Sequence, residues 1–271
     1  MTSVKSRGRC RFCHEELRHT FVDLGKTPLS NSYLAAADLQ RAEPTYPLHA
    51  YVCAACYLVQ LEEFETPDNI FSDYAYFSSY SETWLKHAET YARKMVERFG
   101  YHAASLVVEV ASNDGYLLQY FKAKGIPVLG IEPARNVAVI AEAKGIPTVT
   151  KFFGEKTATE LVQAGHSADL LLGNNVLAHV PDLNDFVEGL RILLRPTGVI
   201  TMEFPHLLKL IEGYQLDTLY HEHFSYFSFL AVEQVFARHG MKLFDVEELS
   251  THGGSLRIYA CHDQDTSKPI R

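Results

Sequence analysis

From residue 105 onward, short apolar runs alternate with stretches of helical periodicity, and this alternation constrains the fold more than any other feature of the chain. Such runs are typical of strands buried on both faces, and βαβ alternation with short connections predicts a doubly wound parallel sheet. The predicted strands are residues 106–110, 127–131, 148–150, 168–173 and 198–204, and the predicted helices are residues 115–124, 134–144, 155–164 and 182–194.

Two further strands are predicted near the end of the chain, after a helix at 229–239. Residues 241–249 and 255–262 are joined by a short segment that contains two glycines, which predicts an antiparallel hairpin. A parallel sheet that ends in an antiparallel hairpin is the arrangement of class I S-adenosylmethionine methyltransferases. We therefore expect an α/β fold with a Rossmann-like sheet of that class.

Two Cys-x-x-Cys pairs lie in the first 65 residues, Cys10 with Cys13 and Cys53 with Cys56, whereas Cys261 stands alone. Each pair places two thiolates on a tight turn, so that two turns can surround one Zn²⁺ tetrahedrally; a redox dithiol, which needs only one pair, is the rival interpretation. Four thiolates leave no open coordination position, so a structural metal is expected. Nearby histidines that could replace a ligand are His14, His19 and His49.

The chain is predicted to consist of a zinc-binding module at 1–65, a connection at 66–100 and a methyltransferase domain at 101–271. A module of that size is too small to build a core of its own. Within the connection, residues 71–80 are predicted to form a loop. Ser79 and Glu82 fit a capping box, and apolar residues at 3–4 spacing predict an amphipathic helix that ends at Gly100.

The loop after the first strand of the sheet is the predicted cofactor site, because ligands bind at the carboxyl ends of strands and at helix N-termini. The dehydrogenase fingerprint G-x-G-x-x-G is absent, so a pyrophosphate-binding turn is poorly supported. Glu132, after the second strand, could accept hydrogen bonds from both ribose hydroxyls or could cap the helix that begins near Pro133. Asn174 could bind a ligand or a neighbouring loop. The predicted cofactor-binding residues are Glu109, Ala111, Ser112, Asn113, Asp114, Gly115, Glu132 and Asn174.

Tyr220, His221, Glu222 and His223 form the densest polar cluster of the sequence. They follow the fifth strand and are expected to face the same edge of the sheet as the cofactor loop, which favours an acid/base site. A second metal site is the rival interpretation, but His-Glu-His lacks the i, i+4 histidine spacing of H-E-x-x-H.

Several stretches, taken together and in this order, resemble the zinc-containing sugar C-methyltransferases, and the resemblance covers nearly the whole chain. They are the two Cys-x-x-Cys pairs and residues 24–32, 76–81, 109–115, 220–223 and 252–257. The resemblance implies that S-adenosylmethionine donates a methyl group, typically to C-3 of a TDP-linked 4-keto-deoxysugar, in deoxysugar biosynthesis. Zinc has no part in the transfer in this interpretation.

The resemblance also assigns roles to the polar cluster. A proton on the carbon next to a ketone is acidic because the enolate spreads its charge onto oxygen, and a histidine is suited to removing it. His223 is then the expected base, Tyr220 and Glu222 place the substrate or stabilise the charge, and His221 is the less favoured base. Two departures from the family are expected to matter: Ala111 stands where the family has glycine, and the chain ends ten residues after Cys261, where the family continues into a further C-terminal domain.

Charge and composition limit the other classes of function. The chain has 25 basic and 33 acidic residues, a formal net charge of −8, which disfavours a nucleic-acid partner. No stretch approaches the roughly 18 apolar residues of a membrane span, so no membrane partner and a cytoplasmic location are expected. Two alternatives stay open: an O- or N-methyltransferase with the same cofactor loop, and a non-catalytic zinc-stapled module that binds a partner.

Overall fold

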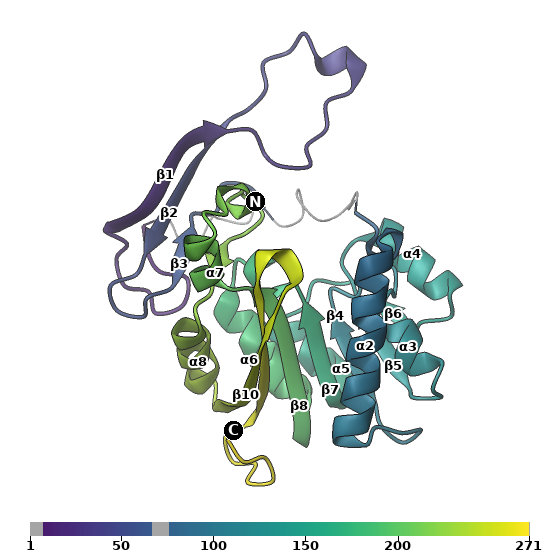
Figure 1. The fold of residues 1–271 in the computed structure, drawn as a ribbon. Coiled ribbons are helices and arrows are strands. Elements are labelled where there is room, and N and C mark those ends of the chain that lie inside the picture. Colours follow the sequence, from purple (N-terminus) through teal and green to yellow (C-terminus); the bar gives the residue numbers. More distant parts are fainter. Residues whose placement is uncertain (1–7, 67–75, 271) are drawn as a thin grey trace.

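A seven-stranded sheet forms the centre of the molecule (Figure 1). The computed structural model describes residues 8–66 and 76–270, so residues 71–75 of the predicted loop lie outside it. In the order of the sheet, the strands are β10 (Met241–Leu249), β11 (Ser255–His262), β8 (Leu194–Pro205), β7 (Ala168–Asn174), β4 (Val107–Val110), β5 (Val128–Ile131) and β6 (Thr148–Val149).

The sheet has the predicted mixture of parallel and antiparallel pairs. Strands β4 to β8 are parallel to one another, whereas β11 is antiparallel to both β8 and β10. The last strand of the chain is therefore inserted between the fifth strand of the parallel series and β10. The predicted Rossmann-like fold with a terminal antiparallel hairpin is confirmed.

Helices cover both faces of this sheet. Helices α2 and α3 pack on one face, where Tyr91, Met95 and Phe121 are fully buried, and helices α5, α6 and α8 pack on the other. Among the described residues, no helix combines the length and apolar character that crossing a membrane requires. The helices are α2 (Glu82–Phe99), α3 (Leu118–Lys122), α4 (Arg135–Ala143), α5 (Glu155–Gln163), α6 (Leu183–Leu193), α7 (Leu207–Glu212) and α8 (Phe229–Arg238).

Two local predictions differ from the structure. The cap of α2 is Ser81, whose Oγ accepts from the backbone N–H of Trp84 at 3.3 Å, and not Ser79, whose hydroxyl donates to Asp114. Helix α3 begins at Leu118, three residues after the predicted start, because the chain from 111 to 117 forms turns at the edge of the sheet. The C-terminal end of α2 agrees with the prediction, since Gly100 adopts a left-handed cap with φ 72°.

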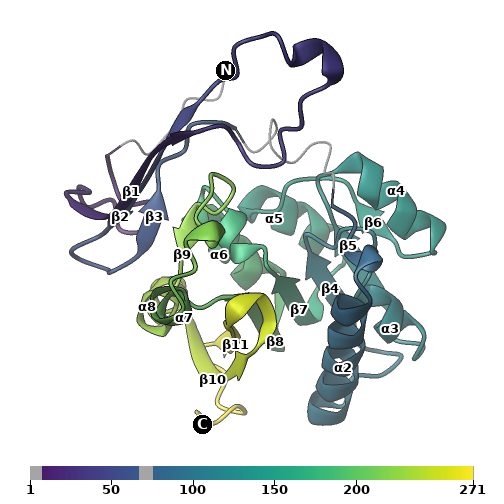
Figure 2. The same cartoon turned by 45° about the horizontal axis from the view of Figure 1, so that its top comes forward.

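A second, antiparallel sheet is formed largely by the N-terminal part of the chain. Its strands are β1 (His19–Thr27), β2 (Tyr46–Val52), β3 (Val59–Leu61) and β9 (Ser225–Tyr226). Figure 2 shows β9 beside β3, so a segment from the far half of the sequence completes this sheet. Its small core is also shared, because Leu48, Val59 and Leu61 pack with Leu207 and Leu210 of α7.

Candidate functional site

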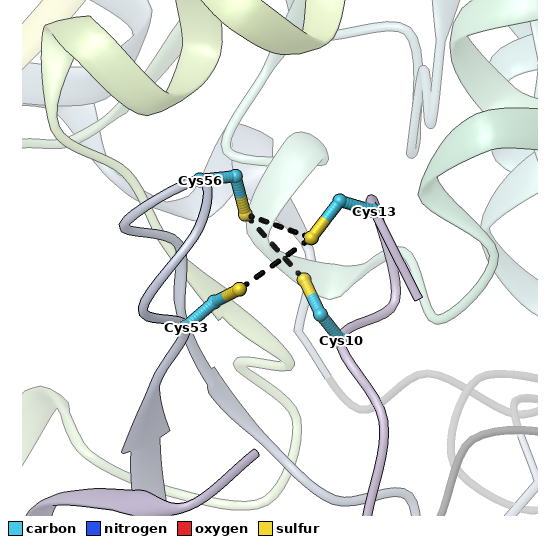
Figure 3. Close-up of side chains that lie close together, drawn as sticks. All are labelled: Cys10, Cys13, Cys53 and Cys56. Atoms are coloured by element: carbon cyan, nitrogen blue, oxygen red, sulfur yellow. Dashed lines mark hydrogen bonds between the residues drawn. The ribbon is translucent and has the colours of Figure 1, made fainter. Parts of the chain in front are cut away.

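The four paired cysteines meet at one end of the N-terminal sheet, with their sulfur atoms directed toward one another (Figure 3). The Sγ atoms of Cys13 and Cys53 are 3.4 Å apart, those of Cys10 and Cys56 3.5 Å, and all four lie within 4.8 Å of one another. Zn–S bonds of about 2.3 Å place the sulfurs of a tetrahedral site about 3.8 Å apart. The sulfur arrangement fits a closed zinc site and is too wide for disulfides, which require about 2.05 Å.

Both cysteine turns have the same backbone geometry. The N–H of His14 donates to the carbonyl of Cys10 at 3.0 Å, and the N–H of Tyr57 donates to the carbonyl of Cys53 at 3.0 Å. His14 and Tyr57 both adopt left-handed backbone, with φ of 64° and 60°. Two matching turns that face each other are expected of a four-thiolate site and not of a single redox pair.

Surrounding polar groups support the cysteine site without adding a ligand. Gln60 donates from Nε2 to the Sγ of Cys10 at 3.2 Å, the kind of hydrogen bond that orients a metal ligand. The metal-ligating group of the described residues consists of the four cysteines and contains none of the three candidate histidines. His49 instead contacts Thr20 and Tyr51.

A cavity of about 610 Å³ lies at the carboxyl ends of β4, β5 and β7. It brings together residues from the predicted cofactor site and from the predicted acid/base cluster, and the nearest two of these, Asn174 and Tyr220, are 46 positions apart in the sequence. The predicted site residues in its wall are Ala111, Asn113, Glu132, Asn174, Tyr220, Glu222 and His223.

The remaining predicted residues do not line this cavity. Glu109 is fully buried within β4, and burial raises its pKa well above the usual range. Ser112 is also buried, Asp114 pairs with Lys144 beside the loop, and Gly115 with φ 75° packs so closely on Ile146 that a Cβ would clash. His221 turns away and donates from Nε2 to the carbonyl of Pro47 at 3.2 Å.

Asn113 forms hydrogen bonds that join the segment before α2 to the loop after β4, the predicted cofactor loop. Its Nδ2 donates to the carbonyl of Tyr76 at 3.0 Å, and its Oδ1 accepts from the N–H of Ser78 at 2.9 Å. Tyr76 and Ser78 are themselves part of the cavity wall. The loop and the aromatic segment therefore form one continuous wall.

Glu132 contacts the start of the helix that follows it, which is one of the two roles that its sequence position suggested. One carboxylate oxygen accepts from the N–H of Ala134 at 2.8 Å, at the start of α4, and the other accepts from the N–H of Asn113 at 2.9 Å. Burial raises the pKa of Glu132 above its ordinary value. Each oxygen can accept a second hydrogen bond, so a carboxylate that caps the helix can also receive hydroxyl donors from the cavity.

The cavity wall fits a nucleoside-containing cofactor. The carboxylate of Glu132 supplies acceptors for hydroxyl groups, and Phe152, Phe153 and Phe186 supply apolar surface for a planar base. Ala111 follows β4 in left-handed backbone, with φ 56°, which turns the chain at the point where it lines the cavity. Such groups at the carboxyl edge of a parallel sheet are suited to S-adenosylmethionine.

His223 has a defined tautomer. Its Nδ1 lies 2.9 Å from the carbonyl oxygen of Thr218, which can only accept, so Nδ1 carries the hydrogen. Its Nε2 then presents a lone pair and accepts from the hydroxyl of Tyr220 at 2.9 Å. Burial lowers the pKa of His223 to about 4, so the ring is neutral at neutral pH.

Sequence reasoning missed several residues of the cavity wall. The ring of His179 lies 4.7 Å from that of His223. Asn175 and His252 both adopt left-handed backbone and contact each other, with Nδ2 of Asn175 3.1 Å from Nε2 of His252. The available signal was position: Asn175 directly follows Asn174 at the end of β7, and His179 lies five residues after Asn174. The wall residues missed include Asn31, Tyr76, Trp84, Asn175, His179 and His252.

Two family models match the chain. The model described as "Putative zinc binding domain" matches residues 10–71. The model described as "Methyltransferase domain" matches residues 84–246, which is more than half of the chain. The first range contains the four-cysteine site and the second contains the cavity wall from Trp84 onward, apart from His252.

Among curated proteins, C-methyltransferase NovU of Streptomyces niveus is 35% identical over 257 residues, which is 95% of this chain and 61% of NovU. A ubiquinone biosynthesis O-methyltransferase of Azorhizobium caulinodans is 25% identical over 114 residues, which is 39% of this chain and 45% of that protein. The chain thus spans about three fifths of the length of NovU and less than half of the length of the O-methyltransferase.

Solved structures match about two thirds of the chain. Magnesium protoporphyrin IX methyltransferase from Synechocystis PCC 6803, with bound SAH, superposes with a TM-score of 0.50 and 16% identity over 66% of this chain and 83% of that one. At this level of identity the likeness shows a shared fold.

Proposed function

The chain belongs to the methyltransferase family in which a zinc-binding domain precedes the methyltransferase domain, with zinc and S-adenosylmethionine as cofactors. From this premise we propose that it transfers a methyl group from S-adenosylmethionine to C-3 of a nucleotide-linked 4-keto-deoxysugar by way of an enolate. The observation that carries the proposal is the single cavity whose wall holds Glu132 and Asn113 together with Tyr220, Glu222 and His223.

Proton removal is the step that this chain's own residues would perform. The neutral Nε2 of His223 accepts the proton from the carbon beside the ketone, and the electrons of that C–H bond pass into the enolate. The negative charge of the enolate raises the pKa of the adjacent imidazolium, which opposes the lowering caused by burial. S-adenosylmethionine, when bound, supplies an electrophilic methyl group to the enolate carbon.

Tyr220 and Glu222 are proposed to act beside the base. The hydroxyl of Tyr220 already donates to the Nε2 of His223, so it must turn toward the substrate oxygen when that nitrogen takes a proton. Glu222 is buried, and burial raises its pKa. A carboxyl group in this position can bind a sugar hydroxyl. The cysteine site holds the N-terminal sheet and provides no open position for a reacting group.

Hydrogen exchange at C-3 tests the proposal directly. The protein should exchange this hydrogen of a TDP-4-keto-deoxysugar in D₂O, and the substitution His223→Asn should slow both exchange and methylation by about 10²- to 10⁴-fold. S-adenosylmethionine affinity should stay unchanged, and His102→Asn, on the exposed surface, serves as the matched control. Methylation of oxygen or nitrogen without exchange at C-3 would contradict the proposal.

Two further predictions from charge and composition belong to the proposed function. A small molecule is the partner that the cavity fits, and the net charge of −8 disfavours a nucleic-acid partner. A cytoplasmic location is proposed as well, and the unbridged cysteine pairs support it because free thiols are typical of reducing compartments.

A further inference from the structure

One residue of the N-terminal segment 8–66 lines the cavity, and it is Asn31. It lies in the loop that follows β1, and its Nδ2 donates to Oε1 of Glu222 at 2.8 Å. This hydrogen bond joins residues 191 positions apart in the sequence. The loop therefore brings a polar side chain into the proposed active site from the sheet that the cysteines hold.

The backbone at Asn31 is suited to this contact. Asn31 has φ 58°, in the left-handed region that asparagine tolerates better than most residues, and its carbonyl accepts from the N–H of Tyr33 at 3.0 Å. The turn directs the chain back after Pro28 and leaves the amide side chain facing Glu222. A residue held in this region of backbone space is a common feature of functional sites.

The N-terminal sheet holds the neighbouring residue of the polar cluster as well. His221 donates to the carbonyl of Pro47, and Pro47 is the register partner of Lys26 at the end of β1, just before the loop that carries Asn31. His221 and Glu222 are thus fixed by the same end of the same strand pair. Downstream, β9 pairs with β3. The segment 221–226 is fastened to the N-terminal sheet along its length.

We propose that Asn31 is a positioning residue of the methyltransferase site, which orients the carboxyl group of Glu222 toward the methyl acceptor. The inference rests on the proposed function and deepens it, because it makes the N-terminal sheet a part of the reacting site. Because Glu222 is only 4% exposed, few water molecules can donate to its carboxyl group. A hydrogen-bond donor from the protein therefore determines the orientation of this group. The amide of Asn31 is that donor.

Two substitutions test the donor while keeping the fold. Asn31→Gly removes the side chain and suits the left-handed backbone, and Asn31→Asp keeps the shape but replaces the donor with an acceptor. Both should lower kcat for methylation roughly 10- to 100-fold, the usual effect of losing a hydrogen bond to a charged group, and leave the Kd for S-adenosylmethionine within about twofold. Ser32→Gly, exposed in the same loop, should match the parent protein.

A double-substitution cycle separates positioning from loop damage. In a Glu222→Met background, no side-chain oxygen is left to accept from the amide of Asn31, so Asn31→Gly should lower kcat by less than about threefold further. An undiminished effect in that background would overturn the inference, because Asn31 would then act through another group.

An NMR measurement without substrate tests the contact between Asn31 and Glu222 independently of the proposed function. The side-chain amide resonances of Asn31 in ¹⁵N-labelled protein should shift when Glu222→Gln is introduced, with no substrate present. Failure of the parent protein to methylate a 4-keto-deoxysugar, with this shift intact, would overturn the proposed function and leave the contact standing. Methylation by the parent protein, together with Asn31 variants as active as Ser32→Gly, would overturn the inference alone.

Discussion

The two sheets are stabilised in different ways. The seven-stranded sheet is covered on both faces by its own helices, whose buried side chains form two large hydrophobic clusters. The N-terminal sheet has a much smaller cluster, completed by Leu207 and Leu210 from α7, and a four-cysteine site at its end. We therefore expect this small sheet, which lacks a sufficient core of its own, to depend on the metal and on the apolar side chains of α7. The N-terminal part of the chain also binds the segment that carries His221 and Glu222, through Pro47 and Asn31.

Removal of one zinc ligand should destabilise the N-terminal sheet strongly and leave the large sheet intact. Structural zinc contributes about 10–16 kcal/mol of apparent binding free energy in zinc-finger peptides, so Cys53→Ser should expose residues 8–66 to rapid amide exchange. The large sheet, which contains none of the ligands, should keep its protection. Exchange mass spectrometry measures both regions in one experiment, and metal analysis of the parent protein should give about one zinc per chain.

The control for this experiment is Cys261→Ser, because Cys261 is a cysteine of β11 outside the metal group. Its substitution should leave the zinc content unchanged. Metal-free protein with full protection of the N-terminal sheet would contradict the dependence of that sheet on zinc.

Elements with local sequence signals could be predicted, whereas an element that is fixed by pairing with a distant segment could not. Strands β10 and β11 have the predicted bounds and helix α2 has the predicted end, because their signals are local: alternating apolar residues, a Gly-Gly turn and a glycine after the last helical turn. Strand β9 could not be predicted, since its two residues are fixed by pairing with Val59 and Gln60. Such pairing has no local signature.

Prediction of the site failed where a side chain forms a hydrogen bond with a residue far away in the sequence. Ser79 fits a capping box, yet its hydroxyl donates to Asp114, and Ser81 is the N-cap of α2. Asn31 lies in a stretch noted only for its resemblance to a family, and nothing in the residues around it indicates a partner at Glu222. The residue types of the site could be predicted, but their contacts depend on tertiary structure.

A buried ion pair offers a way to weaken the large sheet alone. Arg257 of β11 donates to Glu203 of β8 at 2.7 Å, and both side chains are almost fully buried. Burial by itself raises the pKa of Glu203, but His87 and Arg257 lower it on balance, so the carboxylate is ionised. Arg257→Met removes the arginine that pairs with this buried carboxylate and should lower the free energy of unfolding by about 3–5 kcal/mol.

Urea unfolding at neutral pH measures this change. Lys86→Met, which breaks the exposed pair with Glu89, is the matched control and should have no measurable effect. The zinc content of the Arg257 variant should stay that of the parent protein. A loss of stability confined to the N-terminal sheet would contradict the separation of the two regions.

We expect the proposed cofactor-binding edge of the large sheet to depend on Glu132. Glu132→Ala should weaken S-adenosylmethionine binding by about 1.5–3 kcal/mol, because hydroxyl donors lose a charged acceptor. The N–H groups of Asn113 and Ala134 also lose their acceptor, so the loop loosens at the same time. Glu132→Gln, which keeps the shape, separates the two effects in calorimetry, and unchanged affinity in both variants would show that the ribose assignment is wrong.

The smallest expected effect comes from strain within the cofactor loop. Ala111 has φ 56°, a conformation that costs an L-residue with a Cβ roughly 1–2 kcal/mol, whereas glycine adopts it freely. Ala111→Gly should therefore stabilise the protein, although glycine also raises the entropy of the unfolded chain by about 0.4–1 kcal/mol, which leaves a net gain of about 0.5–1 kcal/mol. Ala103→Gly, in an exposed turn outside the left-handed region, has only the entropic term and should destabilise. Opposite signs for these two alanine-to-glycine changes in thermal unfolding would locate the strain in the loop, and equal losses of stability would show that Ala111 is not strained.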